Sequence, residues 1–290
     1  MKKTKSLSLV ILGILLFIPF IKISNAQGSY VGIQISDDYD WLLSVHTENW
    51  NTYTTDDLEA TLANLVPLGS SNLTSVKLHW NAFAPPQSEW TFTATAIGVE
   101  ETGVLLSPLD NTTITSTPVN GTFGWELISN PGENDYWDDT WYIVNDTSSF
   151  LRQTMNLSVI FGVYPLIEVL FAPRNVSWVS LVSDFLSVMS SKGGLYKNIS
   201  ATAQSDGFLV NIPAWGFENN SVDIDINVKY NSNGVLSYYK FSYGGQTLVD
   251  FTLNGYVHPV PFEYIIIFFV LTAILFFEII IYIFMRKSRK

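Results

Sequence analysis

Long stretches in the middle of the chain alternate between apolar and polar residues, the pattern of a β-strand with one face in water. In residues 90–96 every second residue is apolar and the others are Thr. The clearest alternation lies late in the chain, where turns rich in Asn and Gly separate three such stretches. We expect a three-stranded antiparallel meander there, with strands at residues 222–230, 235–243 and 247–253.

One amphipathic helix is expected ahead of this meander. From Trp178 to Met189, apolar residues recur at spacings of three and four, while Ser and Asp occupy the opposite face. A Gly-Gly pair follows and ends the helix. A weaker helical pattern covers residues 56–65, with Thr55 as its N-terminal cap. Helices of this kind bury their apolar side against a sheet.

The fold class follows from these patterns. The apolar run at residues 157–172 is interrupted by Gly, Pro and Glu, so it is too broken to cross a bilayer and is expected to be buried core. Together the patterns predict a mainly β fold with minor α (α+β), built from antiparallel sheets with one or two packing helices. We expect two subregions, a β-rich part at 27–148 and a part with the helix and the meander at 149–257.

The chain begins with the features of a secretory signal peptide. Three Lys residues precede an apolar segment from Leu7 to Ile21, and small residues stand at Ser24 and Ala26. A basic start, a short apolar middle and small residues before the cleavage site are typical of such signals. We therefore expect residues 1–26 to be the signal peptide.

A second apolar segment lies near the C-terminus. Its 21 residues from Tyr264 to Phe284 rise roughly 31 Å as a helix, close to a hydrocarbon thickness of about 30 Å. Basic residues follow at 286–290, and such clusters stay in the cytoplasm. We expect a juxtamembrane linker at 258–263, a transmembrane helix at 264–285 and a cytoplasmic tail. The protein is then single-pass in the cell membrane, with its ectodomain outside.

Charge narrows the classes of partner. Residues 27–263 carry seven Lys or Arg and 25 Asp or Glu, a net charge of −18. Nucleic acid is excluded as a partner because its binding needs a basic footprint. Cations and basic partners stay open. The chain contains no Cys, so stability in an oxidising exterior has to come from packing rather than from disulfides.

Eight Asn-x-Ser/Thr sequons in the outer region predict N-glycosylation. They lie at Asn72, Asn111, Asn120, Asn145, Asn156, Asn175, Asn198 and Asn219. The exterior is rich in Asn and Thr, poor in Lys and free of Cys, and a Pro-containing junction precedes the last apolar segment. In these features the chain resembles single-pass surface glycoproteins of archaea, those of the Asgard type most closely. The resemblance implies a place in the cell envelope and brings no catalytic motif.

The densest group of candidate ligands lies at residues 133–142, where four carboxylates stand among four aromatic residues. The carboxylates are Glu133, Asp135, Asp138 and Asp139, and we expect them to crowd one loop. Three interpretations fit: a solvated acidic turn beside a strand, a calcium site with six to eight oxygen ligands, or a carbohydrate stacked on Trp137, Trp141 or Tyr142. A fainter acidic group, which we expect to be solvated, lies at Asp37, Asp38 and Asp40.

Motifs that mark catalysis are missing from the sequence. The chain has no HExxH, no GxSxG and no Gly-rich phosphate loop. Its three His residues, His46, His79 and His258, are not spaced as metal ligands. We expect no enzyme and no cofactor other than calcium. A Ser-His-Asp triad needs no proximity in the sequence, so only a tertiary structure can test for one.

Glu278 lies within the predicted transmembrane helix. A carboxylate at the centre of a bilayer costs roughly 2.5 to 3.5 kcal/mol, and less toward the edge. One interpretation is that Glu278 is protonated or reaches the headgroups. The other is that it faces a second helix and supports lateral association of copies of the protein.

Location and composition predict a non-enzymatic protein of the cell envelope that serves adhesion, surface-layer association or ligand capture. Its partner is then an envelope protein, a glycan or a lipid. The alternative is a carrier of lipid or another hydrophobic ligand. In the order of their elements, residues 176–253 loosely resemble the half-barrel of bacterial lipoprotein carriers of the outer envelope. That resemblance implies an apolar cavity beneath the sheet.

Overall fold

The computed structural model describes residues 28–46, 48–49, 87–106, 112–154, 170–214 and 222–256. These residues form a ten-stranded antiparallel sheet with short helices, which confirms the mainly β, α+β fold class. The strands are β1 (Asp38–Val45), β2 (Ser88–Ile97), β3 (Glu101–Leu106), β4 (Thr113–Leu127), β5 (Asn134–Val144), β6 (Ser200–Ala203), β7 (Gly207–Ile212), β8 (Ile224–Tyr230), β9 (Leu236–Tyr243) and β10 (Gln246–Leu253). The helices are α5 (Thr147–Thr154), α7 (Trp178–Lys192) and the 3-10 helix η3 (Gly194–Asn198).

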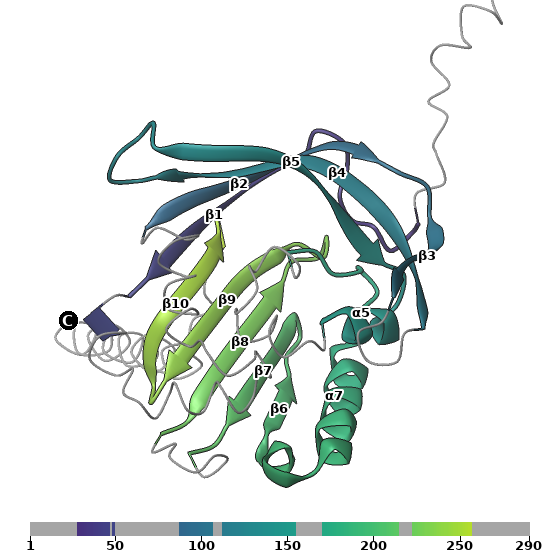
Figure 1. Ribbon diagram of the computed structural model, residues 1–290, viewed down its shortest axis with the longest axis vertical. Coiled ribbons are helices and arrows are strands. Elements are labelled where there is room, and N and C mark those ends of the chain that lie inside the picture. The colour runs from purple at the N-terminus through teal and green to yellow at the C-terminus, as the bar shows by residue number, and fades with distance from the viewer. Residues whose placement is uncertain are drawn as a thin grey trace, which may run out of the picture. The chain divides into compact units, whose positions relative to one another are not determined.

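The first strand joins the two parts of the chain into one sheet (Figure 1). The order is β3-β4-β2-β1-β10-β9-β8-β7-β6, and β5 pairs with β4. Strand β1 lies between β2 on one side and β10, the last strand, on the other. The parts predicted at 27–148 and 149–257 therefore share one sheet, and they belong to one compact unit that ends at Asn254.

Strands β8, β9 and β10 confirm the predicted meander. The turn between β9 and β10 consists of Gly244 and Gly245, whose φ angles are +57° and +77°. Two residues with positive φ make the turn whose twist matches that of the flanking strands. One face of the meander is apolar and buried, at positions such as Ile226, Phe241 and Phe251. The alternation in the sequence thus placed these side chains on the correct face.

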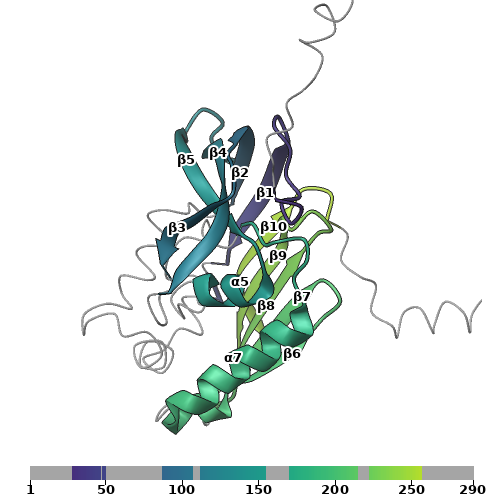
Figure 2. The same cartoon turned by 90° about the vertical axis from the view of Figure 1, so that its right-hand side faces the viewer.

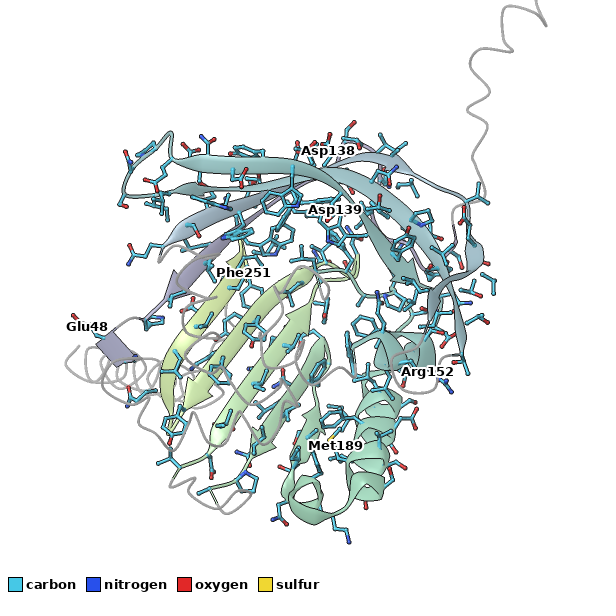
Figure 3. The ribbon with its side chains drawn as sticks, viewed as in Figure 1. Glu48, Asp138, Asp139, Arg152, Met189 and Phe251 are labelled. Atoms are coloured by element: carbon cyan, nitrogen blue, oxygen red, sulfur yellow. The ribbon has the colours of Figure 1, made fainter. Side chains whose placement is uncertain are left out.

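The amphipathic helix is also confirmed, as α7. The hydroxyl of Ser177 accepts a hydrogen bond from the backbone N–H of Ser180 at 3.3 Å and caps the helix. Its buried stripe includes Leu181, Phe185 and Met189. The helix runs beside β6 (Figure 2), and Met189 lies between the two elements (Figure 3). Burial of this stripe against the sheet explains why a Ser-rich segment is helical.

Several predicted segments lie outside the described residues. They are the signal peptide at 1–26, the helix at 56–65, the linker at 258–263, the transmembrane helix at 264–285 with Glu278, and the tail at 286–290. In the described ranges, no helix is both long and apolar enough to cross a bilayer. The membrane topology therefore stays a prediction.

Aromatic rings dominate the core on the inner face of the sheet. Trp41 stacks on Phe251 with ring centroids 5.7 Å apart, across the junction of β1 with β10. Phe92 packs against Phe171 at 4.9 Å. Phe171 and its two neighbours are buried, and they form the described end of the apolar run at 157–172. For these residues the prediction of buried core is confirmed.

A short segment before α7 holds the turn between β8 and β9. The backbone N–H of Ala172 donates to the carbonyl of Gly234 at 2.7 Å, and that of Leu236 donates to the carbonyl of Leu170 at 2.8 Å. Gly234 has a φ of +75°. The turn is therefore fixed both by its own backbone and by a segment that lies some sixty residues earlier in the chain.

The N-terminal end of the described chain is fixed by a buried tyrosine. Tyr30 is 5% exposed, and its hydroxyl shares a hydrogen bond of 2.8 Å with the Thr117 hydroxyl of β4. Burial, with a smaller contribution from the nearby Glu100 carboxylate, raises the pKa of Tyr30 from 10.0 to about 12. Burial likewise raises the pKa of Tyr230 and of Tyr239 above the ordinary value.

These shifts predict that stability declines in alkali. A pKa that is higher in the folded than in the unfolded state adds stability that is complete below the unfolded pKa of 10.0, and that is lost as the pH rises through about 12. We expect the thermal midpoint to fall above pH 10, and to fall less steeply in Tyr30→Phe. The measurement is thermal unfolding followed by circular dichroism between pH 8 and 11.5. Equal slopes in Tyr30→Phe and the wild type contradict the prediction, and Tyr136→Phe, at an exposed site, is the control.

Candidate functional site

The acidic segment at 133–142 is a strand rather than the predicted loop. Its residues form β5, which pairs with β4 from Val144 opposite Ser116 to Asn134 opposite Glu126. Only Glu133 lies before the strand. The loop prediction was wrong because the pair Asp138-Asp139 breaks the alternation on which strands are recognised. Pairing with a long neighbouring strand overrides that local signal.

Strand geometry separates the four carboxylates. Successive side chains point to opposite faces, so Asp138 lies on one face and Asp139 on the other (Figure 3). Asp138 accepts a hydrogen bond from the Thr122 hydroxyl at 2.7 Å, and Asp139 accepts one from the backbone N–H of Thr140 at 2.7 Å. Across the described residues, no three acidic or His side chains are grouped so as to hold a metal ion. The structure thus does not assemble the four residues into a calcium site.

The three aromatic residues suggested for carbohydrate stacking do not share a surface. Trp141 is 7% exposed and packs edge-on against Phe92, with ring centroids 4.8 Å apart. Trp137 also faces inward and contacts Phe123 at 5.3 Å. Tyr142 lies on the opposite face by strand alternation. The two Trp side chains are therefore core anchors, and no flat platform of three rings is formed.

The opposite face of β1, β2, β4 and β5, called the outer face below, is polar and acidic. Cross-strand register brings Asp38, Thr93, Thr122 and Asp138 into one row. The carboxylates on this face are Asp38, Asp40, Glu89, Glu126 and Asp138. None of these four strands contains a Lys or an Arg. Glu89 and Glu126 cannot be recognised in the sequence as members of this group, because only the register shows that they join the aspartates of β1 and β5.

Asp37 has a local structural role instead. Its carboxylate accepts hydrogen bonds from the backbone N–H of Gln34 at 2.8 Å and from the Tyr39 hydroxyl at 2.9 Å. Burial, and then the Asp37 carboxylate, raise the pKa of Tyr39. The group at Asp37, Asp38 and Asp40 is thus divided between a turn and the outer face.

Strand β5 has one open edge. Its odd-numbered residues bond to β4, as the hydrogen bonds from Leu127 N–H to the Glu133 carbonyl and from Asn145 N–H to the Thr115 carbonyl show. Backbone groups alternate in direction along an antiparallel strand, so the N–H and C=O groups of the even-numbered residues point away from β4. In the part of the chain that the structure describes, no strand pairs with this side of β5.

One of the three His residues lies in the described part. The Nε2 atom of His46 lies 2.6 Å from the Asp250 carboxylate, at the junction of β1 with β10. Among the described residues, no Ser side chain is hydrogen-bonded to the ring, so the contact seen there is a His–Asp pair. His79 and His258 lie outside the described residues.

Four of the eight sequons fall on described residues. Asn120, Asn175 and Asn198 are exposed, and Asn145 is half-buried. Asn120 lies on the outer face, where its side-chain oxygen accepts a hydrogen bond from the Thr140 hydroxyl at 2.8 Å. The sequons at Asn72, Asn111, Asn156 and Asn219 lie outside the described residues.

Comparison of the chain with family models, with curated proteins and with solved structures found no match. Its function has to be inferred from its own residues, and the outer face with the open edge of β5 is the surface that they single out.

Proposed function

We propose that the chain is a single-pass protein of the cell envelope whose ectodomain binds a partner and catalyses no reaction. The observation that carries this proposal is the outer face, where five carboxylates on four paired strands stand without a basic side chain among them. Such a one-sign surface attracts partners of positive charge and repels acidic ones. Adhesion, surface-layer association and ligand capture are the roles that fit.

The location of the ectodomain rests on the two ends of the chain. A signal peptide at 1–26 and an anchor at 264–285, followed by basic residues, put the folded unit outside the membrane. The exposed sequons at Asn120, Asn175 and Asn198 are consistent with glycosylation there. Lateral association through Glu278 remains part of this proposal.

A carrier of lipid or another hydrophobic ligand is the second candidate, favoured by the continuous apolar inner face of the sheet. Several of its largest side chains, however, contact one another: Trp41 stacks on Phe251, and Phe92 packs against both Trp141 and Phe171. Rings that fill the space beneath these strands leave less room for a lipid chain. Extraction of the purified protein with organic solvent separates the candidates, because a carrier releases bound lipid.

Protease treatment of intact cells tests the location. We expect added protease to digest the ectodomain without lysis, and a C-terminal fragment with the anchor and tail to survive in the membrane. The measurement is an immunoblot against a tag on the cytoplasmic tail. Protection of the full-length protein in intact cells, together with digestion after lysis, would overturn the proposal.

A further inference from the structure

We propose that the open edge of β5, defined as the side of residues 134–139 that faces away from β4, binds a basic, extended segment of a partner protein as an additional strand. The inference rests on the proposed function, because it needs the ectodomain to meet partners outside the cell. Strand addition of this kind gains affinity from main-chain hydrogen bonds and specificity from alternate side chains.

The backbone of this segment is available for pairing. The outward N–H and C=O groups of Tyr136 and Asp138 have no hydrogen-bond partner among the described residues. The side chains around them are exposed, with Tyr136 at 47%. From Thr140 on the same edge is closed, because the backbone N–H of Thr140 donates to the Asp139 carboxylate at 2.7 Å and the carbonyl of Tyr142 accepts a hydrogen bond from the side chain of Gln153 in α5. The open length is therefore about six residues, enough for one partner strand of ordinary length.

The edge strand at the opposite end of the sheet, β6, is not open to an additional strand in the same way. Strand β6 has only four residues, and α7 packs beside it (Figure 2). Short edge strands and edges covered by a helix are common ways in which proteins prevent unwanted pairing. Strand β5, with 11 residues, lacks both protections.

Charge determines which partner fits. Glu133, Asp135, Asp138 and Asp139 follow one another along the open edge. A second copy of the same strand would bring like carboxylates into opposition, which destabilises cross-strand pairing. A strand with Lys or Arg at alternate positions would instead place positive charges opposite Glu133, Asp135 and Asp139, which share one face of the strand. The occupant is therefore a basic segment of another protein rather than a second copy of this chain.

Binding of a synthetic peptide to the full-length protein in detergent micelles tests the inference. The probe is a fluorescent heptapeptide in which Lys alternates with Thr and Val, and its affinity is measured by fluorescence anisotropy. Tyr136→Pro removes one outward N–H and leaves every charge and the pairing with β4 in place, because Pro is tolerated where the N–H faces solvent. Tyr136→Ala is the matched control, since it removes the same ring and keeps the N–H.

We expect the wild type and Tyr136→Ala to bind the peptide within about threefold of each other, and Tyr136→Pro to bind at least about tenfold more weakly, the effect of losing one hydrogen bond and distorting its neighbours. Asp135→Asn should weaken binding and reduce its dependence on salt. Hydrogen exchange of the wild-type protein provides a second measurement, in which the peptide should slow exchange at residues 134–139.

Two results would overturn strand addition: equal affinity of Tyr136→Pro and Tyr136→Ala, or failure of the peptide to slow exchange in the wild type. The first result would mean that the carboxylates attract cationic peptides without any backbone pairing. The second would mean that the carboxylates serve only to prevent aggregation through this edge. Neither result would contradict the proposed location of the ectodomain outside the cell, which the protease experiment tests separately.

Discussion

Trp41→Ala should lower the free energy of unfolding by about 3 to 5 kcal/mol, the range for truncating a buried Trp. The side chain is fully buried, at 0% exposure, and it stacks on Phe251. Its indole N–H also donates to the carbonyl of Leu236 at 2.6 Å. Truncation leaves both a cavity and an unpaired buried carbonyl, and each of these is unfavourable.

The neighbouring residue provides the control. Leu42 lies on the outer face of the same strand and is 44% exposed, so Leu42→Ala should change the stability by no more than about 0.5 kcal/mol. The measurement is unfolding in urea followed by far-ultraviolet circular dichroism. Because Trp41 lies where β1 meets β10, the loss should shift one cooperative transition. Two transitions, of which only one moves in Trp41→Ala, would contradict a single folding unit.

Gly234→Ala should be the second large effect, at about 2 to 5 kcal/mol. A φ of +75° is unfavourable for Ala, and a Cβ atom at this position would overlap the carbonyl of Ala172. That carbonyl belongs to backbone that is itself hydrogen-bonded to Gly234, so it cannot move aside without breaking the bond. The segment before α7 and the turn after β8 should then separate.

Gly245→Ala isolates the contribution of the overlap. Gly245 has a similar φ of +77°, but no atom lies within 4 Å of an added Cβ. Its substitution should therefore cost only the backbone strain, about 1 to 2 kcal/mol. Urea unfolding of both variants gives the comparison. If Gly245→Ala proved as destabilising as Gly234→Ala, the overlap with the carbonyl of Ala172 would not contribute to the loss of stability.

Local elements of the fold could be predicted because their signals are local. Apolar residues recur at every second position in the meander strands and at every third or fourth position in α7. The buried face of each element can therefore be predicted from its own residues. The Gly-Gly turn at 244–245 was recognisable for the same reason, since few other residues adopt two successive positive φ angles. These elements pack as their patterns predict.

The candidate site could not be predicted in the same way. The sequence of β5 predicts a loop, because its adjacent aspartates interrupt the alternation of apolar and polar residues, and only pairing with β4 stabilises it as a strand. The open edge is a property of the sheet order rather than of any one segment. Likewise Asp38 and Asp138 are 100 residues apart in the chain and reach the same row through two intervening strands.

The fold class, the faces of the meander and of α7, and the excess of acidic residues follow from the amino-acid sequence, because composition and short-range periodicity are properties of neighbouring residues. Which acidic residues share a surface, which aromatic rings are core and which strand lies at the edge are known only from the fold. These depend on pairing between distant segments, such as β1 with β10, where burial and backbone hydrogen bonds select one register among many that the local patterns allow.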